Sequence, residues 1–281
     1  MPKLNVTVTD GLWRALQNFA AAKREPVAEI VAQALSDYLQ ISHSTLYQVS
    51  TSSALVEGVY RGAVTVKTLR EHGDHGLGTF DHLDGEMIVV DGRFFQVRSD
   101  GSVRECEDDA LTPFAVITHF APEPATRVSE CRDFDRLCAH FEGLRSSDNL
   151  FYALRVDGRF ETIRTRAMCK TAEGVPLVQA AAHQPEFEFH DIAGTLVGFW
   201  SPGYAKTLNV PGYHLHFISD DRTRGGHVLQ CSGTNLQLQI ESSGDYRVVL
   251  PTNVDFLQAD LRRDPSADLE RAEHERAPQR P

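Results

Sequence analysis

The sequence predicts an α+β chain that is mostly β with few helices, preceded by a short module of a different kind. Three observations carry this prediction. A series of segments after residue 43 has the residue types and alternation of half-buried strands. One internal segment, residues 133–144, has the clear start and apolar spacing of a helix. Residues 1–42 instead combine one short alternating run with two stretches of helical spacing.

Residues 1–42 are predicted to form a strand followed by two helices. Apolar and polar residues alternate over residues 4–8, which is the period of a half-buried strand. Thr9 and Asp10 can cap a first helix, and Pro26 suits the first turn of a second one. Because so short a segment buries too little apolar surface to be stable alone, we expect it to associate.

Residues 43–281 are predicted to form one domain built mainly of strands. The pairs Asp91-Gly92 and Asp157-Gly158 are typical of tight hairpin turns. The string Val-Asp-Gly-Arg-Phe occurs twice, at 90–94 and 156–160, which suggests two related hairpins. Asp264 and Pro265 either begin a helix or precede a loose tail. The predicted strands are 59–69, 87–98, 152–164, 187–199, 213–219, 227–231, 235–241 and 246–250.

The composition argues against several classes of protein. The chain has 281 residues, of which 41% are hydrophobic and 24% charged, as in an ordinary globular protein. A net charge of -11 argues against nucleic acid or an anionic membrane as the main partner. Five cysteines without a CxxC pair indicate free thiols in a reducing compartment. Because the sequence has neither a signal-peptide pattern nor a long apolar run, we expect a cytoplasmic protein with no membrane partner.

The strongest chemical signal is a group of three histidines near residue 220. His214 and His216 are two residues apart, so on a strand their side chains share one face. The run from Ser219 to Gly226 predicts a turn that brings His227 beside them. Three imidazoles with open positions are typical of a catalytic metal site. Zinc, iron, nickel and copper all accept such ligands, so the spacing does not name the metal, and a His-x-His strand can also be an ordinary polar face.

The first 42 residues resemble the ribbon-helix-helix family. The matching residues are the run Leu4-Asn5-Val6-Thr7-Val8 and two helices, the second ending Gln33-Ala34-Leu35-Ser36-Asp37-Tyr38-Leu39. The resemblance implies dimerisation through a strand paired across a two-fold axis. In many members the outward strand side chains, here Lys3, Asn5 and Thr7, bind DNA. The basic and acidic residues of this segment cancel, so its attraction for phosphate is weak, and we favour a homodimer or higher homo-oligomer over DNA binding.

The rest of the chain, from about Ser44 to Glu273, resembles alpha-acetolactate decarboxylase. The resemblance implies a mixed-sheet or half-barrel metalloenzyme domain over 43–281, and the N-terminal module departs from the family's usual pattern. Four blocks of residues, in the same order as in the family, support the resemblance, and the last block is the most distinctive. These blocks are 44–51 with 55–60, 76–80 with 83–86, Thr165-Arg166, and Pro211-Gly212-Tyr213-His214-Leu215-His216-Phe217 with the His227 segment.

The resemblance also implies a reaction and a metal. Members convert 2-acetolactate to acetoin and CO₂ with Zn²⁺, and the substrate's own ketone accepts the electrons as a metal-stabilised enediolate, so no organic cofactor is needed. His214, His216 and His227 correspond to the family's zinc ligands. Glu86 corresponds to its acidic residue at the metal.

Three further residues correspond to catalytic positions. Arg166 matches the family's active-site arginine and Thr79 a pocket threonine. Glu273 best matches a glutamate near the C-terminus, with Glu270 as the alternative. Without the resemblance, Glu86 would be taken for an ordinary carboxylate after a turn, and Arg166 and Thr79 for ordinary strand residues.

Two other functions fit the same sequence. A cupin-like dioxygenase or isomerase would use the three histidines to hold iron or nickel. A DNA-binding regulator would use the large domain to sense a metabolite, which requires a basic strand surface that residues 1–42 lack.

Overall fold

The structure, a computed structural model, describes residues 5–23, 26–39, 45–122 and 124–274. The chain divides into two compact units, Met1–His43 and Ser44–Pro281. No helix among the described residues is long and apolar enough to cross a membrane.

The N-terminal unit contains the two predicted helices, α1 (Asp10–Lys23) and α2 (Val27–Leu39). The predicted strand at residues 4–8 is not formed over its described part, Asn5 to Val8. A strand requires a hydrogen-bonded neighbour, and these residues have none within the described chain. Lys3, Leu4 and the polar link at 42–44 lie outside the described residues.

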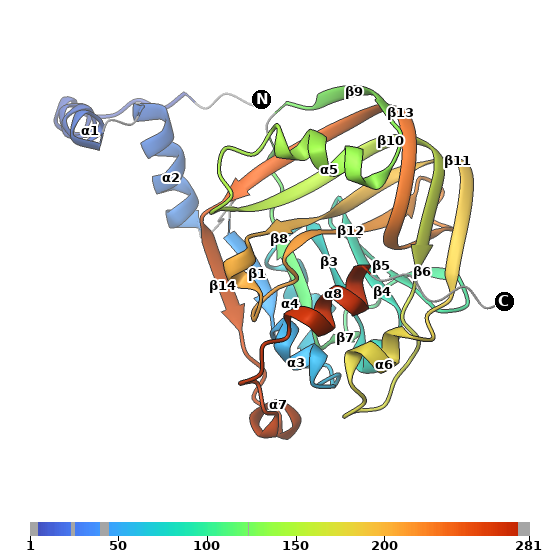
Figure 1. Cartoon of the computed structure of the whole chain (residues 1–281). Helices are drawn as coiled ribbons and strands as arrows, with labels where there is room; N and C mark the ends of the chain where they lie inside the picture. The colour runs from blue at the N-terminus through green and yellow to red at the C-terminus, as the bar shows by residue number, and fades with distance from the viewer. Residues whose placement is uncertain (1–4, 24–25, 40–44, 123, 275–281) are drawn as a thin grey trace. The chain divides into compact units, whose positions relative to one another are not determined.

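The larger unit is mostly β, as predicted, and contains a seven-stranded mixed sheet (Figure 1). Its edge strand β14 runs parallel to β1, whereas the other neighbours are antiparallel. In spatial order the strands are β14 (Asp245–Val249), β1 (Thr45–Val49), β8 (Ala115–Thr118), β3 (His75–Thr79), β4 (Glu86–Val90), β5 (Arg93–Val97) and β6 (Val103–Glu105).

A second sheet of five antiparallel strands carries the histidines. Strand β10 pairs with both β11 and β13, so four of its strands form a closed ring. The strands are β10 (Phe151–Arg166), β11 (Glu186–Ser201), β12 (Gly212–Ser219), β13 (Gly225–Ser243) and β9 (Thr126–Cys131). A small third sheet pairs β2 (Val64–Thr65) with β7 (Leu111–Thr112).

The helices are short and few. The predicted internal helix is confirmed as α5 (Phe134–Glu142), and the carboxylate of Asp133 caps it by accepting from the Arg136 N–H at 2.8 Å. Figure 1 shows α5 across strands β9 and β13. The others are α3 (Ser52–Val56), α4 (Val66–Arg70), α6 (Leu177–Ala181), α7 (Val254–Gln258), α8 (Ser266–His274), and the 3₁₀ turns η1 (Asp81–Leu83) and η2 (Gly203–Ala205).

One predicted strand, residues 59–69, is wrong. Only β2 is extended there, and α4 follows it directly. The side chain of Thr65 caps α4 by accepting from the Thr68 N–H, and Val66 and Leu69 bury one helical face. The short apolar run therefore belongs to a buried helical turn. The predicted strands 227–231 and 235–241 also differ, because both belong to the single long strand β13.

The two copies of Val-Asp-Gly-Arg-Phe have different structures. At 90–94 the string forms the predicted hairpin turn between β4 and β5, with Asp91 and Gly92 in the left-handed region. At 156–160 the predicted hairpin is wrong, because the string lies inside β10 and is paired on both sides. Only a register shift against β13, between Asp157 and Arg159, marks the Asp-Gly pair. The string is therefore no sign of an internal duplication.

The two sheets pack face to face where β4 meets β11, β12 and β13. Buried Ile88 and Val90 of β4 lie in one apolar cluster with Val197 and Ile218 of the second sheet. This packing fixes β4 against the strands that carry the histidines. It therefore determines which side chains of the first sheet reach the three histidines of the second.

Candidate metal centre

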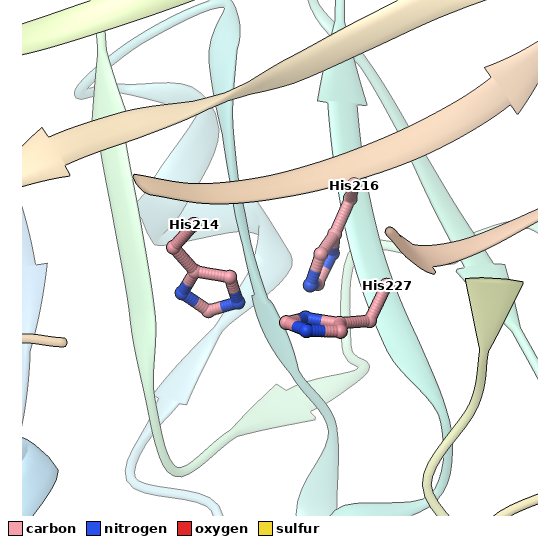
Figure 2. A group of neighbouring side chains, drawn as sticks. All are labelled: His214, His216 and His227. Carbon is pink, nitrogen blue, oxygen red and sulfur yellow. The ribbon is translucent and has the colours of Figure 1, made fainter. Parts of the chain in front are cut away.

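The three predicted histidines converge. His214 and His216 extend from one face of β12, and His227 of β13 lies directly opposite His216 in the register. Figure 2 shows the three imidazoles turned toward one another. Their ring centroids are 5.0–5.4 Å apart, and one ligand atom from each lies within 4.8 Å of the others. Among the described residues this is the one group of its kind that could hold a metal ion.

His216 is oriented by the neighbouring sheet. Its Nδ1–H donates to the carbonyl oxygen of Met87 at 2.8 Å, which leaves Nε2 as a lone-pair donor. That Nε2 is buried and has no hydrogen-bond partner among the described residues. Burial, with His214 beside it, lowers the pKa of His216 well below its usual range, and burial likewise lowers the pKa of His227. Both rings are therefore neutral, which is the form that binds a metal.

Two carboxylates lie close to the histidines. Oε2 of Glu86, on β4, is 3.6 Å from Nε2 of His216. Oε2 of Glu273, on α8, is 3.8 Å from Nε2 of His214 and 3.7 Å from Nε2 of His227. These separations are too long for hydrogen bonds. They fall within the roughly 4 Å that two ligands of one zinc ion can span when each is about 2.1 Å from it.

The donor set fits a metal ion. Burial raises the pKa of Glu86 to about 8, with Glu273 adding to the shift and the Met168 N–H and Arg166 opposing it. A carboxylate buried this deeply is ionised at neutral pH only where a cation lies beside it, and a metal held by the adjacent imidazoles would be that cation. The orphaned Nε2 of His216 indicates the same.

Arg166 and Thr79 lie at the same cavity. Arg166 is the last residue of β10, and its guanidinium donates to the carbonyl oxygen of Ala272 on α8. The hydroxyl of Thr79 donates to the carbonyl oxygen of Gly85 at 2.8 Å. That bond closes the loop between β3 and β4, so Thr79 helps to position Glu86 as well as lining the cavity.

The structure separates the two glutamates that the sequence left as alternatives. The segment after Asp264 is the helix α8, not a loose tail, up to its end at His274. Glu273, on its last turn, lines the cavity beside the histidines. Glu270 instead lines a separate hollow next to Lys206. Glu273 is therefore the glutamate that reaches the site.

A cavity lies beside the histidines. Its polar lining consists of the predicted residues other than His216, together with one that the sequence reasoning missed, Gln184. No sequence signal distinguished Gln184, because it precedes Pro185 in a segment without a recognisable motif. The remaining wall is mainly apolar and is made by Leu55, Gly78, Leu83, Phe114, Met168, Leu177, Ala181, Val210, Leu269 and Ala272.

Comparisons with known proteins identify the family of this chain. The family model for alpha-acetolactate decarboxylase matches residues 46–263. An alpha-acetolactate decarboxylase of Brevibacillus brevis is 41% identical over 234 residues, which cover 83% of this chain and 82% of the relative. One of Methylococcus capsulatus is 43% identical over 230 residues, 82% of this chain and 88% of the relative.

A solved structure has the same fold. The crystal structure of alpha-acetolactate decarboxylase from Bacillus subtilis superimposes with a TM-score of 0.80 at 36% identity, covering 83% of this chain and all of that one. The family match begins after the N-terminal unit, and Glu273 lies beyond its end. Both the extent of the match and the identity to its relatives show that this chain belongs to the alpha-acetolactate decarboxylase family.

Proposed function

We propose that this chain is a carboxy-lyase that converts 2-acetolactate to acetoin and CO₂, with zinc as its metal. The reaction is the one named for its relatives, which are about 40% identical. The observation that carries the proposal is a single cavity lined by His214, His227, Glu86, Glu273 and Arg166. Metal ligands, carboxylates and a cation thereby face one small space, as a decarboxylase of an anionic substrate needs.

We assign the zinc to His214, His216 and His227, with Glu86 and Glu273 as the carboxylates beside it. When bound, zinc supplies a Lewis acid for the negative charge that the substrate's ketone oxygen gains as CO₂ leaves. The Met87 carbonyl holds the His216 ring in one tautomer, and the Met168 N–H holds Oε1 of Glu86 at 2.9 Å. These backbone contacts keep both side chains oriented toward the metal.

Arg166 is assigned to the substrate's carboxylate. Its guanidinium is buried, and its Nε–H has no hydrogen-bond partner among the described residues. A guanidinium pairs well with a carboxylate, and more strongly where water is excluded. After the carboxylate departs, the same cation faces the charge left on the substrate. The proton that completes acetoin then comes from Arg166 or, through water, from one of the two glutamates.

Incubation with racemic 2-acetolactate tests the reaction directly. Acetoin and CO₂ should form in equal amounts, formation should stop after a chelator removes the metal, and zinc should restore it. Acetoin formation that is unaffected by complete removal of metal would contradict the metal assignment. Consumption of dioxygen without acetoin would instead favour the cupin-like reading.

We further propose that residues 1–42 form a dimerisation module of the ribbon-helix-helix type. Of the described side chains in this unit Ala20 is the buried one, whereas Val6, Trp13 and Phe19 are 65%, 45% and 52% exposed. A second copy that pairs with the alternating run at 5–8 would cover apolar side chains and supply the missing strand neighbour.

Deletion of residues 1–42 tests this module. The truncated protein should keep most of its decarboxylase activity, because the family match begins at residue 46, and light scattering should report a smaller oligomer. An unchanged oligomeric state would refute dimerisation by this unit. An electrophoretic shift with the gene's own upstream DNA would revive DNA binding, which the balanced charge disfavours.

A further inference from the structure

Gln184 lines the cavity beside the histidines although no sequence motif marks it. It follows α6 in the segment that leads into β11, and its own N–H donates to the carbonyl oxygen of Ala181 at 3.4 Å. Its side chain is partly buried. The residue therefore belongs to the wall of the cavity and not to the outer surface of the domain.

The backbone fixes Gln184 beside Arg166. The carbonyl oxygen of Pro185, the next residue, accepts from the Ala167 N–H at 3.3 Å. Glu186 then pairs with Arg166 in the β10–β11 register. Because these pairings join the start of β11 to the end of β10, Gln184 and Arg166 enter the cavity from adjacent segments.

The amide of Gln184 is free, whereas the neighbouring polar groups have protein partners. Among the described residues its side chain makes no hydrogen bond. By contrast, Thr79 donates to Gly85, Glu86 accepts from the Met168 N–H, and the Arg166 guanidinium donates to Ala272. A primary amide supplies two N–H donors and one acceptor. A partly buried amide with no protein partner at a cavity wall is therefore available to a ligand.

We propose that Gln184 is a substrate-binding residue whose side-chain amide donates a hydrogen bond to the substrate carboxylate, alongside Arg166. This assignment rests on the proposed decarboxylation of 2-acetolactate. A carboxylate has two oxygens with several lone pairs, so it can accept from a guanidinium and an amide together. The cation balances its charge, and the neutral amide fixes its orientation.

The reaction gives this contact a distinctive kinetic signature. The carboxylate is charged in the bound substrate and becomes neutral CO₂ as the carbon–carbon bond breaks. A neutral donor that contacts only this group therefore binds the ground state at least as well as the transition state. Its loss should raise KM and leave kcat nearly unchanged, whereas loss of Arg166 should lower kcat.

Steady-state kinetics of the zinc-loaded full chain tests the assignment. Gln184→Ala should raise KM for 2-acetolactate roughly 10-fold or more, as loss of a hydrogen bond to a charged group does, with kcat within about threefold of wild type. Gln184→Glu keeps the size but places a carboxylate against a carboxylate, and should raise KM further. Gln179→Ala, at an exposed site on the preceding helix α6, is the matched control and should change neither constant.

Calorimetry with unreactive ligands separates this assignment from the proposed function. The probes are 2,3-dihydroxy-2-methylbutanoate, which keeps the carboxylate, and butane-2,3-diol, which lacks it. Gln184→Ala should weaken binding of the first about 10-fold and leave the second unchanged. If the wild-type enzyme forms acetoin but Gln184→Ala weakens binding of both probes equally, or of neither, the role of Gln184 alone is overturned. A wild-type protein that forms no acetoin and binds neither probe would overturn the proposed function and this assignment with it.

Discussion

The two carboxylates at the histidines are held in different ways. Glu86 lies on β4, with β3 and β5 paired on either side, and is 6% exposed. Glu273 lies on the last turn of α8, the final helix of the described chain, and its side chain is 16% exposed. One carboxylate is therefore built into the sheet, and the other is added by a separate helix.

Helix α8 is attached by packing, one hydrogen bond and nearby ion pairs, and not by strand pairing. Its own residues Leu269 and Ala272 are buried, and Arg166 donates to its last turn. It also packs against α6 and α3, and two ion pairs at the surface hold the segment just before it, Lys206–Asp264 at 2.6 Å and Arg263–Glu57 at 2.8 Å. Such pairs contribute only about 0–1 kcal/mol each. We therefore expect the sheet to determine whether the metal binds, and α8 to complete a site that the sheet has already formed.

His216→Ala should have the largest effect, because it removes the ligand that both sheets hold. Loss of an outer-shell partner costs roughly 10–100-fold in metal affinity, and loss of a ligand itself should cost more. Zinc should fall well below one per chain by atomic emission, and acetoin formation should vanish. The exposed His190→Ala is the control and should change neither. Full zinc content in His216→Ala would refute the ligand assignment.

Glu86→Gln should be the next most severe. Glutamine keeps the shape and can still accept from the Met168 N–H, but it removes the charge beside the metal. Activity should fall roughly 10²–10³-fold, as for loss of one charge-stabilising group, while the melting temperature changes little. Rate and melting temperature should be measured on the same samples. Near wild-type activity would return Glu86 to the status of an ordinary buried carboxyl.

Arg166→Ala should lower kcat by a similar factor, roughly 10²–10³-fold, because the cation faces the charge left after CO₂ departs. It should also lower stability, because the buried Ala272 carbonyl loses its donor at a cost of about 1–3 kcal/mol. Denaturant titration and steady-state kinetics measure the two effects. A loss of stability without any loss of kcat would show that Arg166 only holds α8 in place and has no role in the reaction.

Glu273→Gln should have the smallest effect of the four. Because its side chain is more exposed than that of Glu86, water can partly replace it, and we expect roughly a 10–100-fold loss of activity with zinc retained. Glu270→Gln provides a matched control, since Glu270 lines only the separate hollow, and this substitution should leave activity unchanged. Loss of zinc in Glu273→Gln but not in Glu86→Gln would contradict this account, because α8 and not the sheet would then determine whether the metal binds.

The sequence predicted the histidines on the strands better than the other residues around the cavity. The His-x-His spacing and the turn before His227 follow from strand periodicity, and the structure brings these rings together as expected. Glu86, Arg166, Thr79 and Glu273 were identified through family resemblance, since a single carboxylate, arginine or threonine has no pattern of its own.

What the sequence did not predict depends on contacts between distant segments. The second Val-Asp-Gly-Arg-Phe string is extended because it pairs with β11, 32–40 residues away, and with β13, 73–82 residues away. Val66 and Leu69 enter a helix because both side chains are buried in one cluster with residues of β1, β4 and β5. Gln184 reaches the cavity through the pairing of β11 with β10. None of these contacts is encoded in a local window of residues.

Anomalous diffraction at the zinc edge tests the central claim most directly. In crystals of the zinc-loaded protein we predict one strong peak among the imidazoles of His214, His216 and His227, with the carboxylates of Glu86 and Glu273 facing it. The peak should remain in Glu273→Gln and disappear in His216→Ala. A peak at any other place, or one that persists undiminished in His216→Ala, would contradict the account.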